Sequence, residues 1–399
     1  MASREPMGGG PKLAILSRSF TQSAGGAENY AVNLAQHLAH GFEVHVFCER
    51  SDVVHPGITV HRMGWTIKRP RWVALFLFAW WSWRQTRQGF DIVHSHENTW
   101  HGNVQTVHVR PMRFNLFARA SGPASRLWVY LNIFTSPRLL AHLALEGLRF
   151  RGGEERVVVA VAPALGDLIE STYGVQKSRI RVVPPGIRMP DRASGDELPV
   201  LSKMNARKAL GLPPDGWMLL LVGHNFEKKG LLAALRSLPL LSADVALLVV
   251  GGQAPLVEVW RARCVQQGLG GRVFFTGTLP DSAIAFAAAD CLVHATLDDM
   301  FPLVVLEAMS AKVPVVMSMA PYCLAAPLVE KAQAAWMLHN PHSEQEIVHA
   351  IESLRANAVL RERQLDLGVQ FVRQHSWSQV AQQQVQIYQQ LLSKNPANR

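Results

Sequence analysis

The stretch DDMFPLVVLEAM, residues 298–309, predicts more about the fold and chemistry of this chain than any other. Proline is tolerated at the first position of a helix and disfavours helical backbone at the residue before it, so we expect a turn at Phe301-Pro302 and a helix from Leu303. Asp299 would lie in the turn, and Glu307 in the helix among apolar residues. A buried carboxylate without a partner costs free energy. Glu307 is therefore expected either to be paired within the protein or to bind hydroxyl groups of a ligand.

Short, continuously apolar runs alternate with helical patterns on both sides of this stretch. The runs lie at residues 12–17, 44–47, 91–93, 157–161, 180–183, 218–222, 246–250, 273–275, 291–294 and 313–317. Apolar runs without alternation favour parallel strands whose sheet is covered on both faces. The sequence therefore predicts an α/β fold of two doubly wound, Rossmann-like domains. Ligands bind such folds at the carboxyl ends of the strands, so we expect a cleft there.

The domain boundaries follow from local composition. Residues 1–11 are rich in glycine and carry no apolar core, so we expect a disordered tail rather than a signal peptide. Residues 189–199 are rich in Pro, Asp, Arg, Ser and Gly, which predicts a linker. The expected N-terminal domain is residues 12–190, the C-terminal domain is residues 200–375, and residues 376–399 form a final helix.

Composition bounds the class of protein and its partners. The chain has 399 residues, of which 48% are hydrophobic and 18% charged, which is typical of a globular protein with two domains. Its four cysteines form no Cys-x-x-Cys pair, which indicates reduced thiols in a cytoplasmic protein. The net charge of the chain is +10, and residues 1–190 carry all of it, with 22 Lys and Arg against 12 Asp and Glu. A basic half favours an anionic membrane, glycolipid or nucleic acid as partner. Without a recognisable RNA-binding module, nucleic acid is not expected.

Two loops carry the residue types that bind phosphate. Lys228 and Lys229 follow the apolar run at 218–222, and cationic side chains at such a junction can neutralise a leaving diphosphate. Gly25 and Gly26 precede the first helical pattern, where glycine lets backbone N–H groups approach an anion. A solvated lysine pair and a plain turn are the structural alternatives. The loop is not Gly-x-Gly-x-x-Gly, which disfavours a dinucleotide dehydrogenase.

Four histidines, at positions 94, 96, 101 and 108, occupy a short span of the first half. The His-x-His spacing of His94 and His96 is found in metal sites, but no cysteine lies nearby to complete one, so no metal is expected. The period of a strand places His94 and His96 on the same side. His108 is a candidate for ligand binding, with a structural histidine as the alternative.

These motifs together resemble the GT-B glycosyltransferases of family 4, from about residue 12 to residue 392. Asp299 and Glu307 match the Glu-x7-Glu element of that family, with Asp at its first position. Lys228-Lys229-Gly230 resembles its Arg/Lys-Lys-Gly element, Gly25-Gly26-Ala27-Glu28 its Gly-Gly-x-Glu loop, and Thr106-Val107-His108 its Thr-x-His strand end. The resemblance implies a GT-B fold whose final helix crosses back to the first domain. It also implies an acceptor-binding N-terminal domain and a donor-binding C-terminal domain.

The resemblance further implies roles for individual residues. Glu307 would bind the ribose hydroxyls of the nucleotide, and Lys228 and Lys229 its diphosphate. His108 and Asp299 would meet the donor sugar as catalytic residues. The loop at Gly25 and Gly26 and the backbone near Phe301 and Leu303 would contact phosphate or sugar oxygens. The implied reaction moves a hexose from a nucleotide diphosphate sugar, a UDP-sugar first of all, to a hydroxyl with retention of configuration and without a metal or other cofactor.

Residues 68–84 combine basic residues with Trp and Phe in an apolar run too short to span a membrane. Such a segment suits a helix in a membrane interface or a buried helix with basic ends. The interfacial interpretation predicts a protein peripheral to the inner face of the plasma membrane. The motifs look closest to bacterial enzymes that extend the lipopolysaccharide core, which would give a glycolipid or saccharide acceptor.

The chain departs from the family pattern at three positions. Lys312 stands where glycine is usual, Ala162 where serine is common, and Asp299 where glutamate is usual. These departures concern the donor geometry and leave an altered or weakened activity open. Two alternatives to a transferase also stay open: a nucleotide-sugar epimerase of GT-B fold, and a non-catalytic basic membrane-binding protein.

Overall fold

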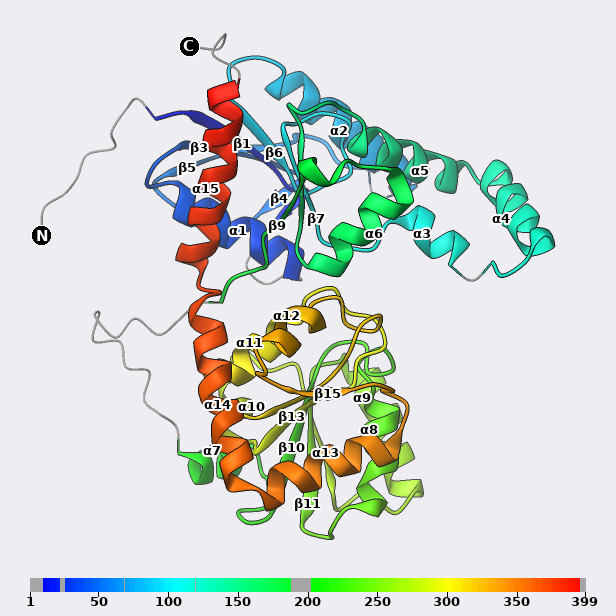
Figure 1. Ribbon diagram of the computed structural model, residues 1–399, viewed down its shortest axis with the longest axis vertical. Helices are drawn as coiled ribbons and strands as arrows, with labels where there is room; N and C mark the ends of the chain where they lie inside the picture. Colours follow the sequence, from blue (N-terminus) through cyan, green and yellow to red (C-terminus); the bar gives the residue numbers. More distant parts are fainter. Residues whose placement is uncertain (1–9, 22–25, 68, 119, 188–201, 395–399) are drawn as a thin grey trace, which may run out of the picture. The chain divides into compact units, whose positions relative to one another are not determined.

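The computed structural model describes residues 10–21, 26–67, 69–118, 120–187 and 202–394. The chain divides into two compact units, one formed by residues 1–186 with 377–399 and the other by residues 187–376 (Figure 1). The expected linker at 189–199 lies outside the described residues, as does most of the expected tail.

The N-terminal unit is built on a sheet of seven described strands, all parallel, in the order β5-β3-β1-β6-β7-β8-β9. Its strands are β1 (Lys12–Leu16), β3 (Glu43–Cys48), β5 (Ile58–Arg62), β6 (Ile92–Ser95), β7 (Val104–Val107), β8 (Val157–Ala160) and β9 (Ile180–Val182). In the centre, Leu13 pairs with Val44 on one side and with Ile92 on the other. The central strands β6, β7 and β8 are buried along their whole length, which fits the continuous apolar runs of the sequence.

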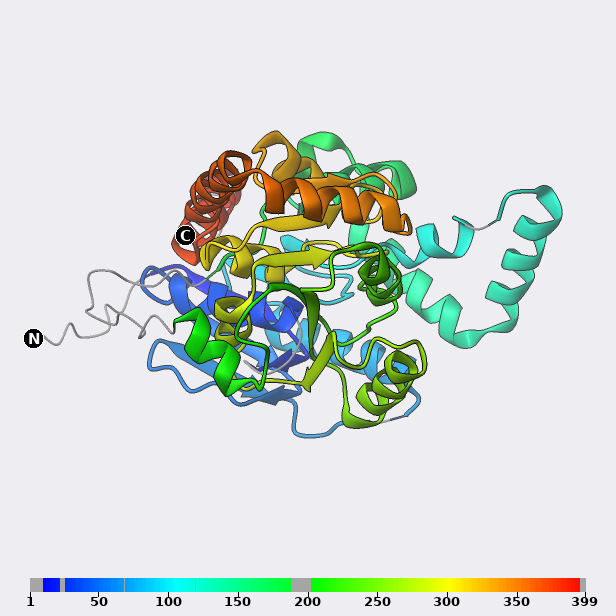
Figure 2. The same cartoon turned by 90° about the horizontal axis from the view of Figure 1, so that it is seen from below.

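Helices cover this sheet or extend from it (Figures 1 and 2). They are α1 (Gly26–Leu38), α2 (Arg71–Thr86), α3 (Met112–Phe117), α4 (Pro123–Thr135), α5 (Pro137–Phe150), α6 (Pro163–Tyr173) and α15 (Trp377–Lys394). The short strands β2 (Ser19–Phe20) and β4 (Arg50–Ser51) pair beside the sheet. Helix α15 packs against α1, so the end of the chain belongs to the N-terminal unit, as predicted for the final helix.

The C-terminal unit has a parallel sheet of six described strands in the order β12-β11-β10-β13-β14-β15. Its strands are β10 (Trp217–Val222), β11 (Val245–Val250), β12 (Val273–Gly277), β13 (Cys291–His294), β14 (Val315–Ser318) and β15 (Trp336–Leu338). The helices are α7 (Lys203–Ala209), α8 (Leu231–Ser237), α9 (Ala254–Gln266), α10 (Ala283–Ala288), α11 (Leu303–Ser310), α12 (Ala326–Lys331), α13 (Glu344–Ala356) and α14 (Ala358–Arg373). Leu247 and Leu248 are adjacent residues of β11, so their side chains point to opposite faces of the sheet. Each belongs to a different buried core, and the sheet is therefore covered on both faces.

The fold confirms the predicted α/β class with two doubly wound parallel sheets. Every predicted apolar run overlaps an observed strand, although β14 begins at Val315 rather than at residue 313. The strand begins later than predicted because α11 ends there in a Schellman motif. In this motif Val313 N donates a hydrogen bond to Ala308 O at 2.8 Å, and Lys312 N donates one to Met309 O at 3.2 Å. Lys312 has a φ of 55°, a left-handed conformation that glycine adopts without cost. This backbone explains why glycine would suit position 312.

Candidate functional site

The C-terminal unit reverses its strand order between β10 and β13, which are neighbours in the sheet. Open parallel sheets bind ligands beyond the carboxyl ends of the strands at such a switch point. The loop after β10 contains Lys228 and Lys229, and the loop after β13 contains Asp299. The topology therefore brings together residues that lie 70 positions apart in the sequence.

The side chains of Lys229 and Asp299 meet at this switch point. The Lys229 ammonium forms a short ion pair with Asp299 Oδ2, which also lies 3.2 Å from Nε2 of the buried His294. Burial opposes ionisation of Asp299, but the hydrogen bond and charge of His294 together with Lys229 outweigh it and hold the Asp299 pKa below its usual range. Burial also lowers the pKa of His294, although Asp299 partly offsets the effect. Asp299 is thus an ionised carboxylate beside a fixed cation.

Lys228 lies on the solvent side of the same loop. Its ammonium is 3.1 Å from Asp298 Oδ2, and its carbonyl oxygen accepts hydrogen bonds from Leu297 N at 2.7 Å and Thr296 Oγ1 at 3.0 Å. These bonds hold the two loops together through the backbone. Gly230 adopts a φ of 81°, and a Cβ atom there would overlap the carbonyl oxygen of Ala295. The glycine after the lysine pair is therefore required for this close approach.

Glu307 lies within α11, which begins at Leu303 as predicted. Its carboxylate is half-buried, and it accepts no hydrogen bond and forms no ion pair with any described residue. Burial, and then the charge of Asp281, raise the pKa of Glu307 above its usual value. The described residues thus offer the Glu307 carboxylate no partner. Burial of this carboxylate costs free energy, which hydrogen bonds from a ligand could offset.

The start of α11 also leaves backbone donors open. Pro302 occupies the N-cap position and supplies no side-chain cap, and the first N–H groups of any helix lack partners within it. Phe301 is partly buried against the core of this unit, and its ring centroid lies 6.1 Å from that of His375. The structure thus places Phe301 and Leu303 at a helix N-terminus, where oxygen atoms of an anion are favourably bound.

In the N-terminal unit, three of the four clustered histidines meet at the end of β6. His96 Nδ1 lies 3.0 Å from His108 Nε2, and the His94 and His96 ring centroids are 4.4 Å apart. His94 also bonds to the Tyr388 hydroxyl and to Thr106 Oγ1, both at 2.6 Å. His101 instead lies 3.4 Å from Ser82 Oγ of α2. No group of three or more His, Cys, Asp or Glu side chains in the described part of the chain is placed to hold a metal ion.

His108 is held neutral by its surroundings. Burial, together with the charge of Arg149, lowers its pKa to about 3. Its ring packs edge-on against Tyr30, at a centroid distance of 5.1 Å. The buried Arg149 donates to Gln105 Oε1 at 3.2 Å and to Asn98 Oδ1 at 2.8 Å. A neutral imidazole can donate and accept hydrogen bonds to a hydroxyl group without adding charge.

Some predicted residues fall outside the described part of the chain or away from these clusters. Gly25 and Lys68 are not described, and Gly26 is the first residue of α1. Residues 71–86 form α2, whose Ala74, Phe78 and Ala79 are buried and whose most exposed aromatic residues are Trp80 at 46% and Trp83 at 37%. The described helices include none that is long and apolar enough to cross a membrane.

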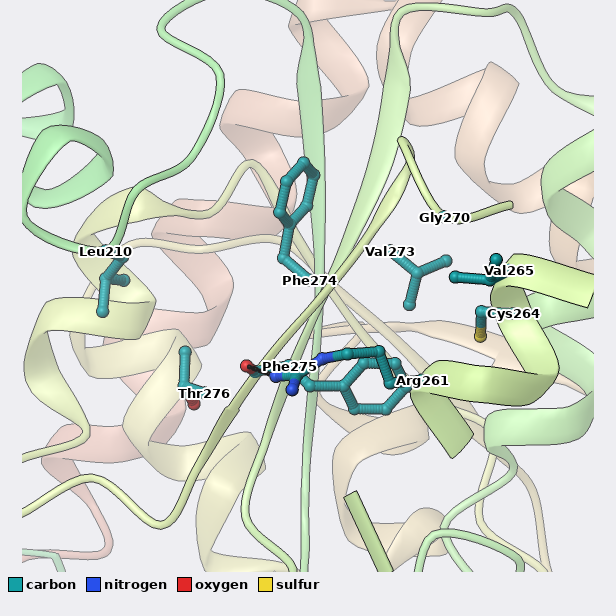
Figure 3. A pocket seen from close by; sticks show the side chains of 9 residues that line it. All are labelled: Leu210, Arg261, Cys264, Val265, Gly270, Val273, Phe274, Phe275 and Thr276. Carbon is teal, nitrogen blue, oxygen red and sulfur yellow. Dashed lines mark hydrogen bonds between the residues drawn. The ribbon is translucent and has the colours of Figure 1, made fainter. Parts of the chain in front are cut away.

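A cavity of about 290 Å³ lies beside the edge strand β12, away from the switch point (Figure 3). Its lining includes Arg261, Cys264 and Phe275, and none of the predicted site residues that are described. Arg261 is already engaged, since it bonds to Glu258 Oε1 at 2.6 Å and to Phe275 O at 3.2 Å. The cavity is therefore separate from the candidate site.

Sequence reasoning missed three residues that complete the two clusters. His294 contacts Asp299, Tyr30 packs on His96 and His108, and Arg149 lies behind the histidines. For His294 a signal existed, because it ends the predicted strand at 291–294, where polar residues of parallel sheets meet. Tyr30 and Arg149 lie within helical patterns and gave no comparable signal.

Known families match both halves of the chain. The glycosyl transferases group 1 family matches residues 202–366, and glycosyltransferase family 4 matches residues 24–189. Lipopolysaccharide glucosyltransferase WaaG of Escherichia coli (strain K12) is 27% identical over 224 residues, which cover 55% of this chain and 58% of WaaG. The aligned part is thus less than two thirds of that relative.

Solved structures agree with the sequence families. The crystal structure of WaaG, a glycosyltransferase involved in lipopolysaccharide biosynthesis, has a TM-score of 0.76 at 18% identity and covers 94% of this chain and 99% of that one. Anabaena HepE in complex with UDP has a TM-score of 0.69 at 16% identity, covering 95% and 100%. At these identities the likeness shows the fold, which is GT-B. With both halves of the chain matched, this protein belongs to the group 1, or family 4, glycosyltransferases.

Proposed function

We propose that this protein transfers a hexose from a nucleotide diphosphate sugar to a hydroxyl of a glycolipid or oligosaccharide, with retention of configuration and without a metal. The observation that carries the proposal is the half-buried Glu307 carboxylate, which has no described partner and follows the Lys229–Asp299 ion pair by eight residues. A pair of ribose hydroxyls would supply the donors that Glu307 lacks. The diphosphate would then meet the lysine loop.

The chemistry follows from the charges at the switch point. As the bond between C1 of the sugar and the diphosphate oxygen breaks, negative charge grows on the diphosphate and positive charge on the sugar. Lys228 and Lys229 would stabilise the negative charge on the diphosphate, and the ionised Asp299 would stabilise the positive charge on the sugar. The acceptor oxygen bonds to C1 on the face that the diphosphate leaves, and its proton passes to a diphosphate oxygen. No strong protein base is needed for this step.

For the sugar we keep the roles that the family resemblance implies. The neutral His108 would accept a hydrogen bond from a hydroxyl of the donor sugar, and its low pKa keeps it uncharged throughout the physiological range. The N–H groups at Leu303 and the loop at Gly25 and Gly26 would bind sugar or phosphate oxygens. UDP is the nucleotide that we propose first, because UDP is the ligand named for one of the structural relatives.

The membrane is proposed as the place of action. A glycolipid acceptor lies in a bilayer, and residues 1–190 carry all of the net positive charge, which favours the anionic inner face of the plasma membrane. Synthesis of lipopolysaccharide or another cell-envelope glycan is the process that we propose, in line with the WaaG relative.

The test is isothermal titration of the full-length protein with UDP, GDP, ADP and TDP. We expect one nucleotide to bind, Glu307→Ala to lower its affinity by about 100-fold and Lys229→Ala by about tenfold. Glu362→Ala is the matched control, since Glu362 is an exposed helical carboxylate of the same unit, and should bind as the parent does. Absence of binding across the panel, or equal losses in Glu307→Ala and Glu362→Ala, would overturn the proposal.

A further inference from the structure

Helix α4 carries the densest group of exposed apolar side chains in the described part of the chain. Leu127, Trp128, Leu131 and Phe134 are 61%, 68%, 55% and 72% exposed, respectively. Leu127, Leu131 and Phe134 follow the spacing i, i+4, i+7, so they share one face of the helix, and Trp128 flanks it. A contiguous apolar face of this kind marks an interaction site.

The opposite face of α4 is what holds the helix to the protein. Ile133 is buried and Val129, four residues earlier, is partly buried. Beside this face, the ring of Tyr130 is 49% exposed, with its centroid 5.1 Å from that of Phe117 in α3. Helix α4 thus packs against the protein through its inner apolar edge, whereas its broader outer apolar face is exposed. In both views α4 lies at the outer end of the segment α3–α5 (Figures 1 and 2).

The segment is fixed rather than loosely attached. Ser136 ends α4 and at the same time caps α5, where its Oγ accepts from Leu139 N at 3.4 Å. At the other end, the buried Glu146 of α5 accepts hydrogen bonds from Met112 N at 2.7 Å and Arg113 N at 3.2 Å, which anchors the start of α3. The apolar face is therefore presented by a defined hairpin.

The charge around α4 has a single sign. Residues 98–145 contain five arginines and no acidic residue. Three of these arginines are exposed, namely Arg113 in α3, Arg126 in α4 and Arg138 in α5. Large apolar and aromatic side chains beside arginines, without acids, are the pattern of a helix that lies in the interface of an anionic bilayer. With 13 residues, α4 is about 20 Å long and too short to span the hydrocarbon core.

We propose that α4 is the surface through which this protein docks on an anionic phospholipid membrane, with Leu127, Trp128, Leu131 and Phe134 inserted among the acyl chains and Arg126 and Arg138 at the phosphates. This assigns the contact to a segment other than residues 68–84, whose apolar face is largely used in the core. The inference rests on the part of the proposed function that places the protein at a membrane, and not on the donor chemistry.

The test is co-sedimentation of the full-length protein with vesicles of phosphatidylethanolamine and phosphatidylglycerol, compared with vesicles of phosphatidylcholine. We expect binding to the anionic vesicles that weakens as salt is added. Trp128→Ser combined with Phe134→Ser should lower the partition coefficient by at least about tenfold. Arg126→Gln and Arg138→Gln should each lower it by about fivefold.

Two control variants make the comparison specific. Val259→Ser with Val359→Ser removes equally exposed apolar side chains from the C-terminal unit and should leave partitioning unchanged. Trp80→Ser with Trp83→Ser tests α2 directly, and a loss of binding there without a loss in the α4 variant would overturn the inference. Circular dichroism and thermal unfolding verify that each variant is folded, as expected for exposed positions.

Two further outcomes would also overturn it. One is equal partitioning of the parent and the α4 variant. The other is self-association of the parent in sedimentation velocity without lipid, abolished by the α4 variant, because that would make a second copy the occupant of this face. Titration with UDP on the same preparations separates the two proposals, since a protein that binds UDP but not vesicles contradicts the membrane inference alone.

Discussion

The polar clusters of the two units differ in charge. In the N-terminal unit, His94, His96 and His108 are neutral imidazoles whose pKa values are lowered mainly by burial. In the C-terminal unit, Lys229 and Asp299 are paired ions, and Glu307 is a carboxylate without a described partner. Neutral groups can be buried with hydrogen bonds alone, whereas buried charges require a counter-charge. The difference teaches that the fixed charge lies on paired ions in the C-terminal cluster, whereas in the N-terminal cluster it lies on the buried Arg149 and the imidazoles beside it stay neutral. Under the proposed function, the first arrangement would meet the charged diphosphate and the second the hydroxyl groups of the sugar.

The sharpest test of this contrast removes the charge at Asp299. Asp299→Asn should lower turnover by at least about 100-fold, because the carboxylate stabilises charge that develops on the sugar. Release of UDP from UDP-glucose in the presence of extracted glycolipid measures the rate.

Asp298→Asn is the control for that variant, since Asp298 pairs with Lys228 at the more exposed side of the loop. An exposed pair contributes at most about 1 kcal/mol, so turnover should change little. Equal rates for Asp299→Asn and the parent would show that the ionic cluster is structural.

The next test uses acid to charge the neutral cluster. A histidine with a lowered folded pKa stabilises the native state fully above its unfolded pKa of about 6.5, and that stability is lost as the pH falls toward the folded value. For His94, whose folded pKa is lowered to about 3, this loss amounts to about 2 kcal/mol between about pH 7 and pH 5.

His94→Gln should therefore reduce the acid sensitivity of urea unfolding by about that amount, even if the variant is less stable at neutral pH. His40→Gln is a suitable control, because His40 is exposed in the turn after α1 of the same unit. An unchanged pH dependence in His94→Gln would mean that His94 is not held neutral in the folded protein.

The smallest expected effect is also the most diagnostic of a ligand site. Because the folded pKa of Glu307 is raised, its ionised form destabilises the protein above the unfolded pKa of about 4.3. Glu307→Gln should raise the free energy of unfolding at neutral pH, and the gain should vanish as the pH falls to the unfolded pKa.

The same substitution should weaken UDP binding, so that stability and affinity change in opposite directions. Urea unfolding gives the first quantity and titration the second. A variant that loses stability together with affinity would indicate that Glu307 has a structural partner.

Much of the C-terminal unit could be predicted because its signals are local. The strand at 291–294, the Phe-Pro break and the start of α11 at Leu303 all follow from runs of apolar residues and from proline stereochemistry. Short or partly polar strands were missed, such as β5 at the sheet edge and the three-residue β15, because neither gives a clear period. Composition predicts an interfacial helix at residues 68–84, because composition alone does not show which apolar side chains the core uses.

The sequence by itself determined the doubly wound α/β class, the lysine loop and the two carboxylates eight residues apart, because backbone preferences and apolar periodicity act over a few neighbouring residues. Only the tertiary structure decided that Asp299 is paired while Glu307 has no partner among the described residues, that His94, His96 and His108 form one neutral cluster, and that α4 has a more exposed apolar face than α2. These outcomes depend on burial and on contacts between segments that are distant along the chain. Burial sets the electrostatic cost of each charge, and it is a property of the packed protein.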